Sequence, residues 1–528
     1  MVTKDSRGLR IALILPYPCC PEWQARLAVR LRETDLFSVT VFGLEEQIPD
    51  RASGQDCFSH WRAQDARLFA HKLEAAGQRD YEELPGELSA SKSLEQKTFP
   101  KLSALLEGTD DQSTDVIIWL LPGSPPNQLL DKAVLGVWSL SSVEREAAGF
   151  WELVEGIPVV TCELYTSQAE PARRRILNRA FAKTDHLSFT RTLLRVRAIS
   201  ESLIVSTLDE FRRNGEVSSP LPPIDHRAPI REGHPGPFRL LGALCWLYGR
   251  YLVSLATRRF HRDQWQLAYR LGGDRLSQTG LIRLAPDDNG FWADPFVICR
   301  DDRTIVFFEE YEVSTSKGRI VAIELLPDGS VGPMEVILDL DHHLSYPFLF
   351  EHDGALYMIP ESADADRVEA FRCIEFPHKW EPHAVLLDNV RAFDATLLEH
   401  DGRWWMFAAV QHNGNTTCDE LHLFHAPGPF DEWTSHPANP VSLDIRCARP
   451  AGNLFEHEGQ LYRPAQDCSE LYGYALSIQR ITKLSVKEYQ EETVDVILPD
   501  WADDIRGTHT INQEAGVTVY DCFVRRRN

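Results

Sequence analysis

Short apolar runs alternate with helical patterns over the first 140 residues of the chain. The apolar runs predict buried strands at 11–16 (IALILP), 37–43 (FSVTVFG), 115–123 (DVIIWLLPG) and 136–140 (GVWSL). Between the first two runs, WQARLAVRLRET has its apolar residues at helical spacing. Strands that alternate with helices are typical of an α/β domain with a mostly parallel sheet. We expect this domain over residues 8–200.

A helical region and a linker are predicted to follow this domain. Residues 171–212 are basic with helical spacing, and residues 213–237 are rich in Pro, Gly and polar residues, as linkers are. The apolar stretch 238–260 contains four arginines. It fits a packed helix between domains, an interfacial helix on an anionic membrane, or a span, although an arginine near mid-span is costly in lipid. We assign 201–284 to the linker region.

Beyond residue 285 the pattern changes to short alternating strands with turn residues between them. One unit recurs five times at a spacing of about fifty residues, with a short strand, a turn such as EHDG (351–354) and an aromatic return strand. Aligning the turns brings five residues into the same place, namely Asp294, Tyr346, Asp394, Ala451 and Thr508. Five units of this length predict an all-β, five-bladed propeller over 285–528.

The net charge and the cysteines of the chain indicate which binding partners and which cellular compartment to expect. The chain has 78 acidic and 55 basic side chains, and its net charge of −23 disfavours binding to nucleic acid. Its eleven scattered cysteines form no CxxC pair, which is typical of reduced thiols in a cytoplasmic protein. Residues 1–18 lack the features of a signal peptide. We therefore expect a cytoplasmic protein, and the segment 238–262 leaves peripheral membrane contact open.

Signatures of cofactor or metal binding are weak in this sequence. We find no phosphate-binding loop, no GxGxxG after a strand and no His/Cys cluster with metal spacing. The pair His342-His343 alone is a weak metal signal. We expect no cofactor and no metal.

The propeller region resembles two families. At WADPF (292–296) and FDAT (393–396) it is similar to the five-bladed glycosidases of family 43. It more closely resembles the N-terminal region of plant glucosamine inositolphosphorylceramide transferases, a region that in bacterial proteins follows a formyltransferase-like domain. The residues that match are FWADPF, FFEEY, SYPFLFEHDGALYMIPE, DATLLEHDGRWWMF, DELHLFHA, ARPAGNLF, LYRPAQDCSELYGYAL and RGTHTIN. The resemblance implies a carbohydrate-active propeller, although the transferase activity of the plant enzymes is attributed to a different domain.

The first domain resembles formyltransferases along residues 115–165. That family has an Asn and a His two residues apart after a Gly-containing turn, where this chain has Ser139 and Ser141. The Asp that the family has further on is replaced by TSQAEPARR (166–174). With all three groups absent, the resemblance implies the fold without formyl transfer.

The resemblance to the glycosidases also implies a catalytic site where the blades converge. In that family a first-blade Asp is the base, a third-blade Asp orients the acid, and a fourth-blade Glu is the acid. Asp294 and Asp394 match the first two positions, but the fourth blade has Arg449, which cannot donate a proton at neutral pH. The candidate substitute acids are Glu361, Glu309 and Glu310. We assign Asp294, Asp394 and Glu361 as the catalytic residues.

Arg449 is suited to a different role in the same site. Its guanidinium is able to hold a phosphate or carboxylate through two hydrogen bonds, or to neutralise the two aspartates. In either case we expect Arg449 within ion-pair distance of Asp294 or Asp394. Other polar residues occupy strand positions where apolar ones are usual, and we assign them to substrate binding: His343, Ser345, Tyr346, Glu310, Gln466, Asp467 and His509. Several aromatic residues either stack on sugar rings or fill space between blades, namely Trp292, Tyr346, Trp404, Trp405 and Tyr462.

Three functions fit these patterns. The first is an enzyme that acts on a glycan or glycolipid precursor, by glycosyl transfer or unusual hydrolysis. The second is a glycan-binding or scaffolding protein without catalysis. The third is a membrane-surface assembly factor whose key element is the segment 238–262. The expected ligand is a sugar or glycolipid with an anionic group in reach of Arg449.

Overall fold

The structure is a computed structural model, and it forms two compact units, residues 1–251 and 252–528, each described by itself. The residues that it describes are 8–17, 19–34, 36–45, 58, 61–65, 82–83, 95–108, 114–145, 148–168, 173–216, 235–286, 290–412 and 415–527.

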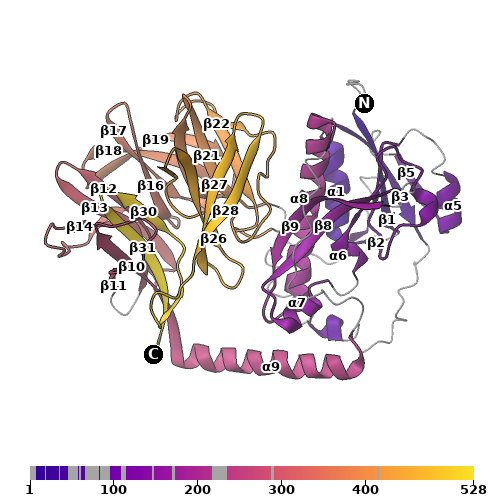
Figure 1. Cartoon of the computed structure of the whole chain (residues 1–528), viewed down its shortest axis with the longest axis horizontal. Helices are drawn as coiled ribbons and strands as arrows, with labels where there is room; N and C mark the ends of the chain where they lie inside the picture. Colours follow the sequence, from indigo (N-terminus) through magenta and orange to yellow (C-terminus); the bar gives the residue numbers. More distant parts are fainter. Residues whose placement is uncertain are drawn as a thin grey trace. The chain divides into compact units, whose positions relative to one another are not determined.

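The first unit is built on a seven-stranded mixed sheet with the order β5-β3-β1-β6-β7-β8-β9 (Figure 1). The strands from β5 to β7 are parallel, whereas β8 is antiparallel to both of its neighbours. The sheet strands are β1 (Leu9–Pro16), β3 (Phe37–Leu44), β5 (Glu95–Phe99), β6 (Val116–Trp119), β7 (Val137–Leu140), β8 (Val159–Gln168) and β9 (Arg173–Lys183). A separate short pair joins β2 (Cys19–Cys20) and β4 (Glu82–Glu83). The predicted α/β domain is confirmed.

Helices α1 and α8 contact each other and the sheet. The helices of this unit are α1 (Glu22–Glu33), α5 (Leu102–Gly108), α6 (Ser141–Glu144), α7 (Phe150–Glu155) and α8 (Phe189–Asn214). The prediction of a helix over 171–212 was wrong in its first part, because β9 occupies Arg173–Lys183 and pairs along its length with β8. The basic and apolar residues of this segment are compatible with a strand when a neighbouring strand is available for pairing.

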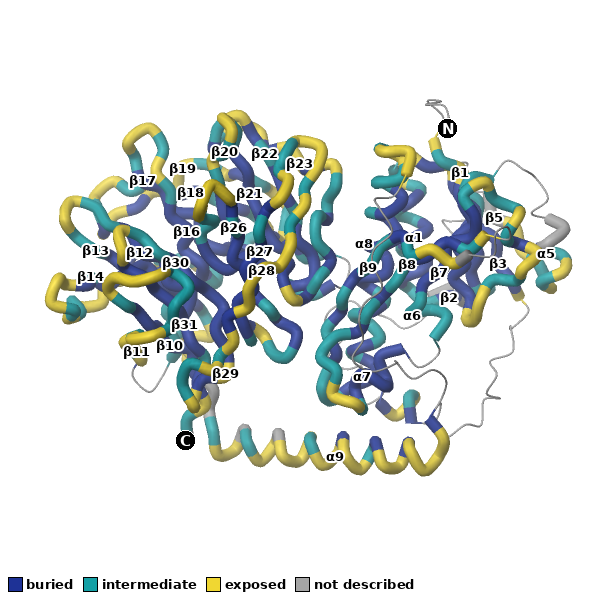
Figure 2. The backbone as a smooth tube through the Cα atoms, viewed as in Figure 1, coloured by how far each residue is buried: buried dark blue, intermediate teal, exposed yellow. Residues whose placement is uncertain are grey.

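The predicted linker region 201–284 contains helices and strands in its described residues. Helix α8 ends at Asn214, α9 spans Pro237–Phe260, and β10 (His261–Leu271) and β11 (Ile282–Leu284) follow, whereas residues 217–234 lie outside the described residues. The beginning of α9 packs its buried Leu240, Ala243 and Leu247 with aromatic residues of the first unit. Most of its other described side chains are exposed (Figure 2). Among the described residues, one helical segment, Pro237–Thr257, has the length and apolar composition to cross a membrane.

Five sheets form the second unit, which confirms the five predicted blades (Figure 1). The first three sheets have the orders β12-β13-β14-β15, β16-β17-β18-β19 and β20-β21-β22-β23. Their strands are β12 (Gly290–Arg300), β13 (Arg303–Glu312), β14 (Lys317–Leu325), β15 (Glu335–Leu338), β16 (Ser345–His352), β17 (Ala355–Glu361), β18 (Arg367–Glu375), β19 (Lys379–Asp388), β20 (Ala392–His400), β21 (Arg403–Val410), β22 (Leu421–Ala426) and β23 (Thr434–Ser435). The fourth sheet joins β24 (Arg449–Pro450), β25 (Phe455–His457), β26 (Gln460–Asp467), β27 (Ala475–Leu484) and β28 (Tyr489–Ile497).

The fifth sheet takes strands from both ends of the unit. It joins β10 (His261–Leu271), β11 (Ile282–Leu284), β29 (Ile505–Gly507), β30 (Ile511–Glu514) and β31 (Val517–Arg527). Strands β10 and β31 pair antiparallel from His261 opposite Arg527 to Leu271 opposite Val517. The expected boundary at residue 285 therefore does not coincide with the edge of this sheet, which begins at β10. Pairing the first strand with the last closes the ring and covers a long edge.

A two-residue turn joins the first and second long strands of every blade. The central residues of each turn have positive φ, as in Asp353-Gly354 at 50° and 74° and Asp401-Gly402 at 51° and 69°. Positive φ at both positions is the signature of a type I′ hairpin, which Asp-Gly favours. The repeated EHDG segments are therefore hairpin corners.

The inner strands of the first three blades share a bulge. Pairing shifts register after Ala293, Ser345 and Phe393, and the next residue in each case has positive φ. These residues are Asp294 at 54°, Tyr346 at 44° and Asp394 at 54°. A bulge re-aims the side chain of its extra residue. The repeat alignment of these three positions is thus reproduced in the backbone.

Candidate functional site at the inner strands

Polar side chains gather where the inner strands of the five blades meet. The first strands of neighbouring blades contact one another from β12 through β16 and β20 to β24. The ring continues where the Ile511 amide donates to the Ala451 carbonyl at 2.9 Å and Asn512 Nδ2 donates to the Pro295 carbonyl at 2.8 Å. The buried residues that gather here, which we call the axial cluster, are Asp294, Glu309, Glu361, Asp394, Arg449, Gln466, His509 and Asp521.

Half of this cluster comes from one position on the second strand of each blade. Glu309 pairs with Ala293, Glu361 with Ser345, and Gln466 with Arg449. In the fifth blade the Asp521 amide donates to the Thr510 carbonyl at 3.3 Å, and in the third blade the equivalent residue is Ala409. Four of the five blades therefore present a polar side chain from this position.

Arg449 and Asp394 form a bidentate ion pair. Arg449 Nε donates to Asp394 Oδ2 at 2.6 Å, and its Nη2 donates to Oδ1 at 3.1 Å. Gln466 Nε2 donates to the same Oδ2 at 2.7 Å, and the Arg449 guanidinium lies over the ring of Tyr472 at 5.2 Å. The expected contact between Arg449 and an aspartate is confirmed. Both oxygens of Asp394 are engaged, so Asp394 orients Arg449 and is not a free acid or base.

The same contacts limit how Arg449 can bind a ligand. The fork that would grip a phosphate already holds Asp394. Its remaining Nη1 donates to the Thr417 carbonyl at 3.5 Å, and the side chain is 6% exposed. The predicted bidentate grip on a free anion therefore does not fit this arrangement, whereas neutralisation of Asp394 does.

Asp294 lies in a second group with His509 and Asp521. Its Oδ1 accepts from Thr510 Oγ1 at 2.7 Å and lies 3.6 Å from His509 Nε2, while its amide donates to Asp521 Oδ2 at 3.1 Å. His509 Nδ1 lies 2.6 Å from Asp521 Oδ2, and its ring stacks on Trp265 at 4.0 Å. Burial raises the pKa of Asp294 to about 6, against the effect of His509. Burial acts to lower the pKa of His509, but Asp521 and Asp294 outweigh it and raise that pKa.

Glu361 is a buried carboxyl held by two donors. Ser345 Oγ donates to its Oε2 at 3.0 Å, and the Ala363 amide donates to its Oε1 at 2.8 Å. Burial raises the pKa of Glu361 to about 7, and the charge of Asp394 acts in the same direction. At neutral pH this carboxyl thus has a substantial protonated fraction, as a general acid requires.

Glu309 and His343 face each other beside this carboxyl. His343 Nδ1 accepts from the Gly318 amide at 2.9 Å, so Nε2 carries the proton and points toward Glu309 Oε1 at 3.5 Å. Burial raises the pKa of Glu309 well above its usual range, and Asp294 and Glu361 add to the effect. Glu309 is therefore a neighbour of the two candidate catalytic carboxyls whose protonated form is favoured by burial.

Three residues assigned to substrate binding are held by contacts outside the group defined above. Glu310 follows Glu309 on β13, points the other way and accepts from Arg319 Nε at 2.8 Å. Asp467 follows Gln466 and accepts from the Ser469 amide at 2.9 Å. The Tyr346 hydroxyl is fully buried between Thr396 Oγ1 at 2.8 Å and the Gly452 amide at 2.6 Å. Glu310 and Asp467 face away from the axial cluster, whereas Tyr346 ties blades together close to Asp394. The assignment of these three residues to substrate binding stays a prediction.

Sequence reasoning missed Asp521, Thr510 and Tyr472, and it preferred Glu310 to Glu309. A signal for Glu309 and Asp521 is present in the second strand of four blades, where an apolar stretch ends on a polar side chain. The triplets are FFE, IPE, PAQ and VYD, which end on Glu309, Glu361, Gln466 and Asp521. Aromatic residues fill space as expected, since Trp404 and Trp405 are buried in two hydrophobic clusters.

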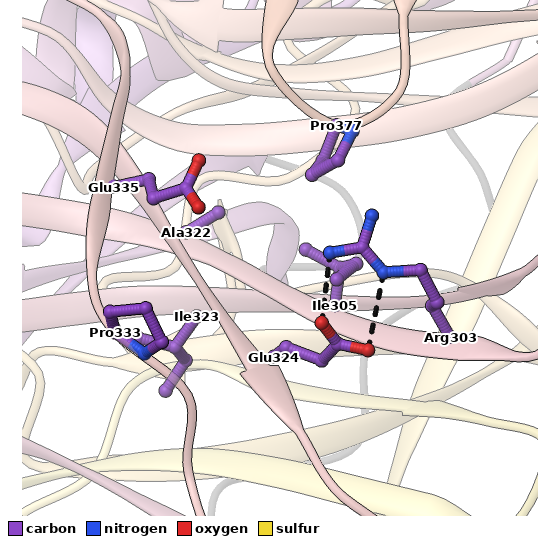
Figure 3. Close-up of a pocket in the computed structure, with 8 residues that line it drawn as sticks. All are labelled: Arg303, Ile305, Ala322, Ile323, Glu324, Pro333, Glu335 and Pro377. Atoms are coloured by element: carbon purple, nitrogen blue, oxygen red, sulfur yellow. Dashed lines mark hydrogen bonds and ion pairs between the residues drawn. The ribbon is translucent and has the colours of Figure 1, made fainter.

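A hollow beside the first blade has no residue of the axial cluster in its lining. Figure 3 shows the residues that line it, namely Arg303, Ile305, Ala322, Ile323, Glu324, Pro333, Glu335 and Pro377, and its volume is about 30 Å³. Arg303 Nη2 donates to Glu324 Oε2 at 2.8 Å across one side. This volume is that of about one water molecule, so the hollow does not fit a sugar.

In the first unit, Ser139 and Ser141 occupy positions without acid–base chemistry. Ser139 on β7 is fully buried. Ser141 Oγ accepts from the Glu163 amide at 2.9 Å at the start of α6. The Ser139 hydroxyl is thus shielded from solvent, and the Ser141 hydroxyl is used by a backbone hydrogen bond.

Comparison with known proteins places similarity in the propeller. Two relatives are glucosamine inositolphosphorylceramide transferase 1 of rice (Oryza sativa subsp. japonica), 36% identical over 212 residues, and that of Arabidopsis thaliana, 33% identical over 210. Each match covers 39% of this chain and 28% or 27% of the relative, so this chain spans less than a third of their length.

Among solved structures, a family 117 glycoside hydrolase of Zobellia galactanivorans matches 49% of this chain and 90% of its own, with 11% identity and a TM-score of 0.34. The β-xylosidase RS223 matches 46% and 93%, with 11% identity and a TM-score of 0.33. Residues 282–512 match the family model described as glucosamine inositolphosphorylceramide transferase 1, N-terminal, and over these residues the chain is similar to that region.

Proposed function

We propose that the propeller binds a sugar, or the sugar headgroup of a glycolipid precursor, at the axial cluster and catalyses glycosyl transfer or an atypical glycoside hydrolysis. The observation that carries this proposal is the buried pair of carboxyls whose pKa values are raised, Asp294 to about 6 and Glu361 to about 7. Cleavage of a glycosidic bond by acid–base catalysis uses two carboxyl groups, one as acid and one as base, whose different environments set their pKa values.

Each residue of the cluster has a role in this proposal. Asp294 is the base, because it is mostly ionised at neutral pH and Thr510 Oγ1 fixes one of its oxygens. Glu361 is the acid and takes the place of the missing fourth-blade Glu. Asp394, Arg449 and Gln466 form one hydrogen-bonded side of the site, in which Arg449 neutralises Asp394.

The names of the relatives support a carbohydrate ligand. The rice and Arabidopsis proteins are named glucosamine inositolphosphorylceramide transferase 1, and the family model of that description matches residues 282–512, within the propeller. We therefore propose a glycolipid precursor with an anionic headgroup as the ligand class. No nucleic acid partner is part of the proposal.

A non-catalytic glycan-binding or scaffolding protein is the alternative. It is favoured by the bidentate engagement of Asp394, which removes one of the three carboxyls assigned to chemistry. The first unit, if formyltransferase-like, also lacks acid–base groups at Ser139 and Ser141, so both units would have lost catalytic groups.

Contact with a membrane surface is compatible with either function. The exposed apolar side chains of α9 include Phe238, Leu241 and Trp246, and Arg250 lies over the Trp246 ring at 4.4 Å. Exposed apolar and cationic groups on one helix are typical of interfacial binding. We propose a cytoplasmic location with peripheral membrane contact through 238–262.

A turnover assay separates the two functions. The full chain is incubated with aryl glycosides, and separately with nucleotide sugars and an inositol-phosphate glycolipid acceptor, and products are read by mass spectrometry. We expect turnover that falls roughly 10²-fold or more in Asp294→Asn and in Glu361→Gln, the usual effect of losing a general acid or base. Glu399→Gln, an exposed change on β20, is the control. Equal product in all four proteins would contradict catalysis at the axial cluster.

A further inference from the structure

Two histidines and a glutamate converge at the third blade, outside the axial cluster. His412 follows β21, Glu420 immediately precedes β22, and His422 is the second residue of β22. Glu420 Oε2 lies 3.3 Å from His422 Nε2 and 3.5 Å from His412 Nε2. All three ligand atoms lie within 4.8 Å of one another.

These separations fit a shared metal ion better than direct hydrogen bonds. A charge-assisted hydrogen bond between imidazole and carboxylate has a length of about 2.7–2.9 Å. Two ligands at about 2.0–2.1 Å from one tetrahedral ion lie roughly 3.4 Å apart. The observed 3.3 and 3.5 Å bracket that value. The imidazole planes are inclined at 85°, so the rings do not stack. Both Nε2 atoms lie near the same oxygen, Glu420 Oε2.

The backbone holds the three residues in place. His422 pairs with Ala408 in the β21–β22 ladder, and the Val410 amide donates to the Glu420 carbonyl at 3.3 Å. The His412 amide donates to Asn415 Oδ1 at 2.8 Å. The Glu420 side chain is fully buried, and the two histidines are partly exposed. Ligands that the backbone holds in this way are preorganised for a cation.

The ligand types select the kind of ion. Two imidazole nitrogens favour zinc and related transition metals over calcium or magnesium, which take oxygen ligands. Two His and one Glu leave one position open, as in zinc sites with three protein ligands. The sequence has no recognisable metal motif here because His412 and Glu420 stand at opposite ends of a loop.

We propose that His412, Glu420 and His422 bind a divalent transition metal ion of the zinc type. The ion fixes the segment 415–422 against the axial cluster, because the Thr417 carbonyl on this segment accepts from Arg449 Nη1 at 3.5 Å. Cys418, next in the chain, is buried. The site is independent of whether the propeller is catalytic.

Metal content of the full chain, prepared without a histidine tag, tests the proposal. The chelator-treated protein is loaded with Zn²⁺, dialysed, and analysed by mass spectrometry for zinc per chain. We expect one zinc in the wild type and at least roughly tenfold weaker retention in His412→Ala, Glu420→Gln and His422→Ala. His400→Ala, which removes a histidine beside Asp401 on the surface, is the matched control and retains the ion.

A second variant and a spectrum exclude other sites and misfolding. His509→Ala disrupts the other group with metal-like spacing, Asp294, His509 and Asp521, and we expect it to retain zinc. Zinc-edge X-ray absorption on the wild type should show two imidazole nitrogens. Failure of the wild type to retain zinc, equal retention in His412→Ala, loss in His509→Ala, or a shell with fewer than two imidazoles would overturn the proposal.

Discussion

Arg449 and Asp394, 55 residues apart in the chain and in adjacent blades, form a bidentate ion pair with side chains only 6% and 1% exposed. Water screens such a pair weakly, so its two charges depend on each other. Asp394 would otherwise be an uncompensated charge among the four other acidic side chains of the axial cluster, Asp294, Glu309, Glu361 and Asp521. The pair thus sets the electrostatics of the whole axial cluster.

Removal of Arg449 alone should destabilise the protein strongly. We expect Arg449→Met to lower the free energy of unfolding by about 3–5 kcal/mol, because Asp394 is left buried without its counter-ion. The double variant Arg449→Met/Asp394→Asn should recover much of that loss, since neither charge remains. Urea unfolding of the three proteins measures the difference. A double variant no more stable than the single one would show that packing, not charge, dominates at this position.

The raised pKa of Glu361 predicts a pH dependence of stability. Its ordinary pKa is 4.5, and in the folded protein it is about 7, so the folded state holds a proton that the unfolded chain has released. The free energy of unfolding should therefore fall as pH rises from 4.5 to 7, by up to about 3 kcal/mol from this group, and then level off. Glu361→Gln should remove this component, whereas Glu399→Gln should not. Urea unfolding at several pH values measures it, and parallel pH profiles for wild type and Glu361→Gln would refute the assignment.

His509 should stay protonated to higher pH than an ordinary histidine. Asp521 and Asp294 raise its pKa against the effect of burial. Asp521→Asn should bring that pKa down, because the carboxylate 2.6 Å from Nδ1 is lost. Nitrogen chemical shifts of the ¹⁵N-histidine-labelled full chain, assigned with His509→Gln, follow the titration. An unchanged midpoint in Asp521→Asn would contradict the proposed coupling.

The composition of the fifth blade determines where a propeller fragment that folds by itself must begin. A fragment 252–528 should fold, whereas 285–528 should aggregate, because it lacks β10 and exposes the edge of β31 that β10 covers over eleven residues. It also loses Trp265, which stacks on His509. Circular dichroism and gel filtration of both fragments decide the matter. A well-folded 285–528 fragment would show that β10 is dispensable.

Formyl transfer by the first unit is not expected. Ser139 is fully buried and Ser141 accepts a backbone hydrogen bond, so neither can replace the missing Asn and His. Incubation of the full chain with 10-formyltetrahydrofolate and amino sugars should give no formylated product. Product formation that survives Ser139→Ala/Ser141→Ala would show that the chemistry lies elsewhere in this unit.

The repeat and the hairpin turns could be predicted because both are local. Asp353-Gly354 and its equivalents specify a type I′ turn without help from distant residues. The approach of Arg449 to Asp394 followed from the repeat register, since both stand at the start of an inner strand.

The rest of the site depended on pairing that the sequence does not display. Side chains alternate between the two faces of a strand, so a shift of one residue decides whether Glu309 or Glu310 faces the axial cluster. The register of β13 against β12 changes at the bulge after Ala293. Asp521 was missed because its role requires His509, twelve residues away across the fifth blade. Strand β9 was taken for a helix because only its partner β8 distinguishes the two.

Ligand binding at the axial cluster is the central claim, and native mass spectrometry of the intact chain tests it most directly. The probes are glucosamine, inositol phosphate and glucosaminyl-inositol phosphate, the water-soluble headgroup of the proposed ligand class. Asp294→Asn is the informative variant, because Asn tolerates the positive φ of 54° at this position while removing the charge. Arg303→Ala, at the small outer hollow, is the control. We predict a one-to-one complex with glucosaminyl-inositol phosphate in the wild type and the control that is lost in Asp294→Asn. Equal binding by Asp294→Asn, or no complex with any probe, would contradict the account.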